Sequence, residues 1–215
     1  MKPTAREAFD LSLYLVVGPA DTGGRDIVEV VRAAVAGGVT LVQLRDKNAP
    51  LERLVESARA LKDLLAPAGI PLVINDSLEA ALATPAEGLH LGQEDLDPAV
   101  ARAALGRWAI IGTSAGDADE AGRVDPAVVD YVGIGPAYAT GSKADAGAAI
   151  GPEGLSALRA QLDLPLVAIG GITEDRTAEV MACGVEGIAV VSAIGGAADP
   201  EAAARGLKRA VAESR

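Results

Sequence analysis

Aromatic side chains are scarce in this sequence, which has one Trp, one Phe and three Tyr among 215 residues. The chain therefore has few of the rings on which nucleic-acid-binding proteins stack bases. Cationic residues are in deficit as well, because 19 Lys and Arg face 30 Asp and Glu, for a net charge of −11. That charge disfavours nucleic acids and anionic membranes as partners. An anionic substrate needs a locally basic site.

Cysteine and long apolar runs are also nearly absent. Cys183 is the single cysteine, so no internal disulfide can form and a reducing compartment is expected. We expect it to be a small buried residue near a helix end. The first ten residues resemble no signal peptide, and no apolar run is long enough to span a bilayer. The sequence therefore predicts a cytoplasmic protein without a membrane segment.

Apolar residues make up half of the chain and recur as short runs between segments of helical spacing. The runs predict strands at residues 13–17, 41–45, 72–75, 89–91, 109–112, 131–134, 166–169 and 188–191. The spacings predict helices at 27–36, 51–65, 78–82, 98–105, 119–122, 152–161, 174–183 and 200–212. Eight strand–helix units favour an α/β fold, a single compact (β/α)8 TIM-type barrel over residues 1–215, with 1–10 as a flexible lead. An open doubly wound sheet is the alternative, but it predicts a glycine-rich turn after the first strand, where only Gly18 stands.

Two acidic residues follow neighbouring predicted strands at Asp76 and Asp95. Because ligands bind at the carboxyl ends of parallel strands, we expect both carboxylates at one mouth. Oxygen ligands of this kind suit Mg²⁺, with Mn²⁺ as an alternative. No Lys or Arg lies between Asp63 and Ala101, so side chains close in sequence cannot neutralise the pair. The structural alternatives are a helix N-cap for Asp76 and a turn for Asp95.

Polar residues also end the second predicted strand, where alternation places Gln43, Arg45 and Lys47 on one side. Polar groups in a doubly covered strand are costly unless they meet a ligand or partner, and Arg and Lys suit phosphate. The alternative is a core glutamine beside a solvated charge pair with Asp46. Ser114, after the fifth strand, adds a hydroxyl that could bind a ligand or cap the next helix.

Three later loops carry groups suited to a second anion. The long loop from residue 135 to 150 contains Thr140, Gly141, Ser142 and Lys143, which offer hydroxyl, amide and ammonium donors. The loops after the last two strands contain Gly170-Gly171 and Val191-Ser192, where barrels bind phosphate on backbone N–H groups. A tight turn without a ligand is the alternative for the glycine pair.

Taken together, these segments resemble the thiamine-phosphate synthase family. The segments are Gln43-x-Arg45-x-Lys47, Asn75-Asp76, Gly92-Gln93-Glu94-Asp95, Ile111-Gly112-x-Ser114, Thr140-x-Ser142-Lys143, Ala168-Ile169-Gly170-Gly171-Ile172 and Val190-Val191-Ser192-Ala193-Ile194. The resemblance extends over nearly the whole chain. It implies a transferase that joins hydroxymethylpyrimidine diphosphate to a thiazole phosphate, giving thiamine phosphate and pyrophosphate.

The resemblance also implies roles for individual residues. The pyrimidine diphosphate would bind to Gln43, Leu44, Arg45, Asp46, Lys47, Asn75, Ser114 and Lys143. The thiazole phosphate would bind to Thr140, Gly141, Ser142, Gly171, Val191 and Ser192. Asp76 and Asp95 would hold one Mg²⁺, and Lys143, Arg45 and Ser114 would act in catalysis.

Other readings remain open at this stage. Family members commonly have a histidine shortly after the fifth strand, where this chain has Ala115, Gly116 and Asp117. A related thiazole tautomerase uses such a histidine for proton transfer, so its absence argues against that activity. The one histidine, His90, lies between leucines and is predicted to pack. A barrel that binds thiamine phosphate without turnover is the second hypothesis. A carboxylated thiazole as substrate and a homo-oligomer are both compatible with the sequence.

Overall fold

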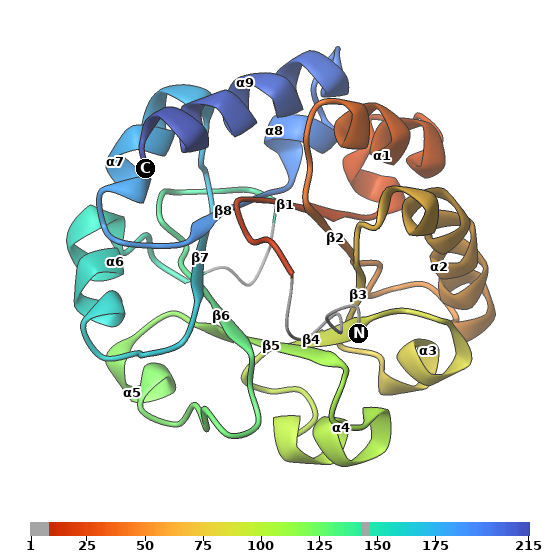
Figure 1. Cartoon of the computed structure of the whole chain (residues 1–215), viewed down its shortest axis with the longest axis horizontal. Helices are drawn as coiled ribbons and strands as arrows, with labels where there is room; N and C mark the ends of the chain where they lie inside the picture. Colours follow the sequence, from red (N-terminus) through yellow and green to blue (C-terminus); the bar gives the residue numbers. More distant parts are fainter. Residues whose placement is uncertain (1–8, 143–146) are drawn as a thin grey trace.

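The computed structural model describes residues 9–142 and 147–215. Eight parallel strands pair in sequence order, and β8 closes onto β1 (Figure 1). The strands are β1 (Leu13–Val17), β2 (Leu41–Leu44), β3 (Leu72–Asn75), β4 (Gly88–Leu91), β5 (Ile110–Ala115), β6 (Tyr131–Ile134), β7 (Leu166–Ile169) and β8 (Gly187–Val190). The surrounding helices are α1 (Ile27–Ala36), α2 (Leu51–Leu65), α3 (Leu78–Ala83), α4 (Pro98–Leu105), α5 (Ala118–Ala121), α6 (Gly151–Arg159), α7 (Thr177–Met181), α8 (Ser192–Gly195) and α9 (Pro200–Glu213). The predicted (β/α)8 barrel is confirmed.

Most predicted element boundaries agree with the structure within two residues, and the larger differences concern β5, α8 and α7. β5 continues past Gly112 to Ala115, so this glycine lies within the strand rather than at its end. A Cβ at Gly112 would lie 2.1 Å from Cζ of Tyr131, so the glycine makes room for that ring. α8 was not predicted, since four residues are too few to show helical periodicity. The predicted helix 174–183 is a 3-10 turn, η4 (Glu174–Arg176), followed by the shorter α7.

Alternation along the strands produces two apolar clusters. One fills the barrel interior and includes Tyr14, Val73, Tyr131 and Val167, while the larger cluster lies between strands and helices. Leu44 belongs to the outer cluster, so its side chain points away from the barrel interior. Its side chain therefore does not reach the cavity, and the binding role of Leu44 stays a prediction. Alternation explains this result, because Leu44 follows the inward-facing Gln43.

Residues 1–8 of the predicted flexible lead lie outside the described part of the chain. Phe9, the first described residue, packs near Tyr131, with ring centroids 5.8 Å apart. Cys183 is buried just beyond α7, as expected. Within the described residues no helix is both long and apolar enough to cross a membrane.

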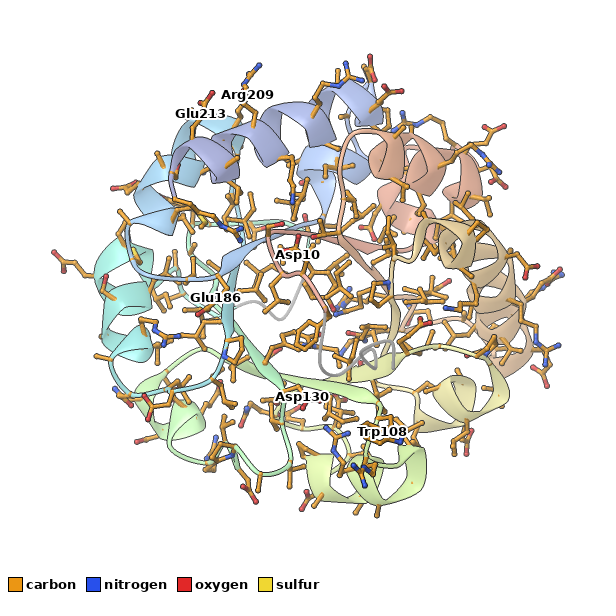
Figure 2. All side chains as sticks on the ribbon, in the orientation of Figure 1. Asp10, Trp108, Asp130, Glu186, Arg209 and Glu213 are labelled. Atoms are coloured by element: carbon orange, nitrogen blue, oxygen red, sulfur yellow. The ribbon has the colours of Figure 1, made fainter. Side chains whose placement is uncertain are left out.

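The amino-terminal edge of the barrel has a repeated arrangement. One acidic residue directly precedes each of β4, β6 and β8. Its carboxylate accepts a backbone N–H from the strand before, that is β3, β5 or β7. It also pairs with a basic side chain of the helix that leads into β3, β5 or β7. Glu87 accepts the Leu72 N–H at 2.8 Å and pairs with Lys62. Asp130 accepts the Ile111 N–H at 2.8 Å and pairs with Arg102 at 2.6 Å. Glu186 accepts the Leu166 N–H at 2.5 Å and pairs with Arg159 at 3.6 Å. Before β2, Thr40 Oγ1 accepts the N–H of Leu13 at 3.1 Å. Figure 2 shows Asp130 and Glu186 inside the ring of helices, whereas Arg209 and Glu213 point outward from α9.

Candidate active site

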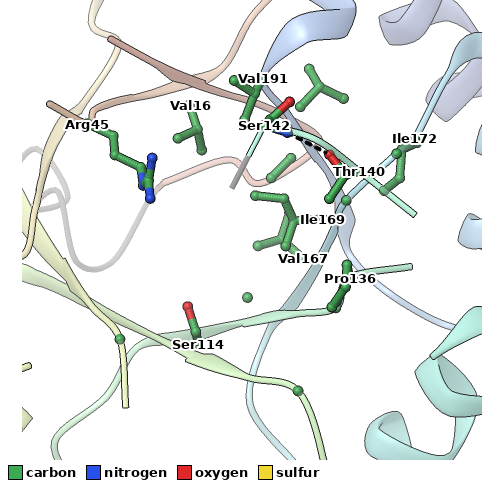
Figure 3. Close-up of a pocket in the computed structure, with 18 of the residues that line it drawn as sticks. Val16, Arg45, Ser114, Pro136, Thr140, Ser142, Val167, Ile169, Ile172 and Val191 are labelled. Atoms are coloured by element: carbon green, nitrogen blue, oxygen red, sulfur yellow. Dashed lines mark hydrogen bonds between the residues drawn. The ribbon is translucent and has the colours of Figure 1, made fainter. Parts of the chain in front are cut away.

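The carboxyl ends of the strands surround a cavity of about 1280 Å³. Its lining includes 13 of the residues predicted to bind ligands: Gln43, Arg45, Lys47, Asn75, Asp76, Asp95, Ser114, Thr140, Gly141, Ser142, Gly171, Val191 and Ser192. Leu44 and Asp46 do not line it, and Lys143 lies outside the described residues. Figure 3 shows Arg45 and Ser114 across the cavity from Thr140 and Ser142. One mouth thus brings together groups that are as far apart in sequence as Gln43 and Ser192.

Asp76 lies at the start of the loop after β3 in a left-handed backbone conformation, with φ of 59°. That conformation is uncommon outside glycine, although Asp and Asn tolerate it better than most residues. Its N–H donates to the His90 carbonyl at 2.9 Å. Ser77, whose Oγ accepts the N–H of Ala80 at 3.1 Å, is the N-cap of α3. The N-cap alternative for Asp76 is therefore wrong.

The Asp76 carboxylate has a cationic partner that the local sequence did not indicate. Lys47 Nζ lies 3.0 Å from Asp76 Oδ2, and both side chains are partly exposed. Burial opposes the charge on Lys47, but Asp76 outweighs this effect and the pKa of Lys47 is raised. The inference that side chains close in sequence cannot neutralise the acidic pair agrees with this contact, because the cation comes from Lys47 in the neighbouring β2 loop.

Asp95 approaches Asp76 from the loop after β4. Burial, followed by a hydrogen bond with Asp95, raises the pKa of Asp76. Burial also acts to raise the pKa of Asp95, but hydrogen bonds with Asp76 and the Gly92 N–H outweigh it, and the pKa is lowered. Asp95 Oδ2 accepts that N–H at 2.6 Å, so the predicted turn role is confirmed as well. The pair therefore favours a proton or a cation between its carboxyl groups.

The donor set is suited to a hard divalent cation. The described residues contain no group of three or more His, Cys, Asp or Glu side chains arranged for a metal. A dedicated Zn²⁺ or Ca²⁺ site normally needs more protein ligands than this pair supplies. Mg²⁺, in contrast, commonly binds through one or two carboxylates and completes its shell with water and substrate phosphates. Asp76 and Asp95 fit that mode of binding.

A chain of polar side chains crosses the barrel interior below the cavity. Gln43 Nε2 donates to Tyr14 Oη at 2.6 Å, and the Tyr14 and Tyr131 hydroxyls lie 2.8 Å apart. Tyr131 Oη is 2.9 Å from His90 Nδ1, and His90 Nε2 is 3.0 Å from Ser114 Oγ. Burial raises the pKa of both tyrosines, so the phenols remain neutral. His90 is therefore more than the packing residue that its apolar neighbours predicted.

This chain can orient the hydroxyl of Ser114. In one consistent order of protons, Gln43 donates to Tyr14, and each following group donates to the next until His90 donates to Ser114. The Ser114 O–H is then directed toward the cavity as a donor. Gln43 and Ser114, predicted separately as binding residues, thus become the two ends of one network. No local pattern in the sequence indicates this link, because it depends on which strands face each other inside the barrel.

The opposite side of the cavity presents hydroxyl groups and backbone amides. Ser142 N–H donates to Thr140 Oγ1 at 3.2 Å, and Ser142 Oγ lies 3.4 Å from Ser192 Oγ. Gly171 has a φ of 62°, and a Cβ there would lie 2.7 Å from the Ala139 carbonyl oxygen. Its N–H donates to no acceptor within the described part of the chain. Loops after β6, β7 and β8 thereby form a compact pocket suited to an anion.

Comparison with known proteins identifies a family that this chain matches. Residues 13–194 match the family model described as thiamine monophosphate synthase. Among curated proteins, thiamine-phosphate synthase of Azorhizobium caulinodans is 55% identical over 96% of this chain and 98% of its own length. That of Moorella thermoacetica is 50% identical, over 94% and 97%.

A solved structure agrees with these sequence relationships. The thiamine phosphate pyrophosphorylase from Pyrococcus furiosus superposes with a TM-score of 0.86 at 37% identity. The match covers 95% of this chain and 96% of that protein. The family-model match, residues 13–194, spans every described residue that lines the cavity.

Proposed function

Because the chain belongs to the thiamine monophosphate synthase family, we propose that it joins hydroxymethylpyrimidine diphosphate to a thiazole phosphate. The family makes it a transferase, and the products are thiamine phosphate and pyrophosphate. One observation carries the proposal: a single cavity has cationic and carboxylate side chains on one side and a second pocket on the other. We call this second pocket, formed by Thr140, Ser142, Ser192 and the Gly171 backbone, the hydroxyl-and-amide pocket. Such a cavity suits two phosphorylated substrates held face to face.

The diphosphate would occupy the side formed by Arg45, Lys47, Asp76 and Asp95. Arg45 lines the cavity, and its guanidinium makes no hydrogen bond to another described residue, so its donors remain for a phosphate. Mg²⁺ held by Asp76 and Asp95 would neutralise charge on the leaving diphosphate. Asn75 and the Ser114 hydroxyl would position the pyrimidine, and Lys143 would share the charge of the leaving group.

The reaction exchanges one bond for another. The bond between the pyrimidine methylene carbon and the diphosphate oxygen breaks, and the oxygen keeps the electron pair. The thiazole nitrogen then supplies its lone pair for the new carbon–nitrogen bond. This nitrogen carries no proton, so no general base is needed. The protein has to hold the nitrogen in line, keep water out and stabilise the leaving group.

The direct test is an assay with both substrates and Mg²⁺. We expect pyrophosphate and thiamine phosphate to appear in equal amounts, and omission of the thiazole phosphate to abolish formation of thiamine phosphate. The proposal fails if the folded protein binds both substrates but releases no pyrophosphate. That result would favour the binding-only barrel.

A substitution at Gly171 tests the assignment of the thiazole phosphate to its pocket. In Gly171→Val, a side chain would enter the space occupied by Ala139 and Tyr138 and would also adopt a positive φ, at a cost of about 1–2 kcal/mol from conformation alone. We expect the KM for thiazole phosphate to rise at least about tenfold, since 1.4 kcal/mol corresponds to that factor. The KM for the diphosphate should remain within about twofold. Steady-state kinetics with each substrate varied in turn will measure both.

Gly23→Val is the matched control for this variant. Gly23 has a φ of 63°, and nothing lies within 4 Å of a Cβ built there. The control therefore carries the same backbone strain without the steric clash. Equal losses for both substrates in Gly171→Val would contradict the assignment of two separate anion sites.

A further inference from the structure

Arg176 lines the cavity next to the loop after β7. It ends η4, directly before α7, and its side chain extends back over the loop after β7. Its Nη1 donates to the Gly171 carbonyl oxygen at 2.7 Å. Its guanidinium carbon lies 4.4 Å from the centroid of the Tyr138 ring. The side chain therefore contacts two of the loops that form the hydroxyl-and-amide pocket.

Those two loops also contact each other through their backbones. The Tyr138 N–H donates to the Gly170 carbonyl oxygen at 2.9 Å. A Cβ at Gly171 would lie 2.9 Å from Cβ of Tyr138, so no side chain separates the loops there. Tyr138 is fixed in turn from α7, because its hydroxyl donates to Glu179 Oε2 at 2.6 Å. Arg176 and Glu179 thus hold the Tyr138 ring and the Gly171 turn against one helix.

Arg176 differs in charge from the lining residues around it. Of the described residues that line it from the loops after β6, β7 and β8, Arg176 is the only charged one. Arg45, Lys47 and Asp76 line the cavity from the loops after β2 and β3, whereas the acidic Asp21 lines it beside α8, where a Cβ at Gly195 would lie 2.9 Å from its carbonyl oxygen. A phosphate in the hydroxyl-and-amide pocket would therefore meet a preorganised backbone whose geometry depends on a single cationic side chain.

We propose that Arg176 is a positioning residue for the thiazole phosphate, because it clamps the Gly171 turn to the Tyr138 loop and fixes the Gly171 N–H toward the phosphate. This inference rests on the proposed function. The planar guanidinium is suited to the role, since it can stack on a ring and donate to a carbonyl at the same time. Lysine can replace the charge but cannot reproduce both contacts. The ring of Tyr138 is an equal part of the clamp, and its hydroxyl supports the ring through Glu179.

The test uses five variants of the whole chain. We expect Arg176→Gln to raise the KM for thiazole phosphate about tenfold, with kcat and the KM for the diphosphate unchanged. Arg176→Lys should recover less than half of that loss. Tyr138→Leu should show a similar increase, while Tyr138→Phe, which keeps the ring but loses the contact with Glu179, should show a smaller one. The Arg176→Gln/Tyr138→Leu double variant should be no worse than either single variant, because both remove the same clamp.

Arg209→Gln serves as the matched control. Arg209 pairs with Glu174 of η4 at 2.7 Å on the exposed side, so the variant removes the same charge close to the same turn without touching the cavity. Thermal melting will confirm that every variant is folded. Equal KM increases for both substrates, full rescue by lysine, or additive losses in the double variant would overturn the proposal.

Failure of the clamp can be separated from failure of the proposed function. Direct binding of thiazole phosphate by calorimetry reports on Arg176 even if no product forms. If wild-type protein binds the compound and Arg176→Gln binds it equally well, the clamp is refuted. If wild-type protein makes no thiamine phosphate, the proposed function fails instead.

Discussion

Asp76→Asn is expected to lower the rate of pyrophosphate release by about a thousandfold and to weaken Mg²⁺ binding. A factor of that size corresponds to roughly 4 kcal/mol, in the range that a metal ion contributes by stabilising charge in a transition state. Asparagine suits this test because it tolerates the left-handed conformation found at Asp76, with φ of 59°. The substitution therefore removes charge with little added backbone strain. Single-turnover kinetics and titration of Mg²⁺ in the presence of pyrophosphate will measure the two effects.

Asp63→Asn is a control with the same change in net charge, since Asp63 is exposed on α2. It should match the wild type in both measurements. Asp95→Asn should resemble Asp76→Asn, although its amide oxygen can still accept the Gly92 N–H. Pyrophosphate release at the wild-type rate in a variant lacking both carboxylates would refute the metal assignment.

The second large effect is expected on stability and concerns the opposite end of the barrel. Arg102→Met should lower the free energy of unfolding by about 3–5 kcal/mol, the usual cost of removing one partner of a buried ion pair. The exposed fractions of the Arg102 and Asp130 side chains are only 14% and 6%. Arg102 also donates to the carbonyl oxygens of Val128, Gly106 and Ala109. Denaturant unfolding followed by circular dichroism will measure the loss.

Arg53→Met provides the comparison on an exposed ion pair. Arg53 and Glu56 are 73% and 69% exposed, so the loss there should stay below about 1 kcal/mol. The Arg102→Met/Asp130→Asn double variant should be more stable than Arg102→Met alone, because it also removes the buried negative charge. A loss for Arg102→Met no greater than that for Arg53→Met would contradict this account of the edge.

The fold could be predicted largely because most strands are short segments dominated by apolar residues and each long helix has a clear apolar face. The prediction of elements failed where a segment is too short to show periodicity, as in α8. It also failed where packing rather than a strand end requires a glycine. Gly112 looked like the end of a strand in sequence, whereas in the structure it accommodates the ring of Tyr131. Such a reason depends on a partner far along the chain, so the local sequence does not contain it.

The candidate site could be predicted to the extent that its residues follow strand ends. That rule brought Arg45, Asp76, Ser114 and Gly171 to one cavity. It could not indicate that Lys47 pairs with Asp76, since that contact joins two loops. Nor could it identify the tyrosines of the polar chain, which look like ordinary core residues in sequence. The occupancy of the two carboxylates by Mg²⁺ stays a prediction.

The repeated acid–amide arrangement at the amino-terminal edge has a bearing on how this barrel can change over evolutionary time. Each acid ties one strand to the next within a pair, so the framework is maintained by local units rather than by the loops at the mouth. Mutations at the catalytic end are thereby largely uncoupled from those that would unfold the chain. Relatives that share this barrel can therefore change substrate through mutations in the loops at the carboxyl end, while the amino-terminal edge remains unchanged.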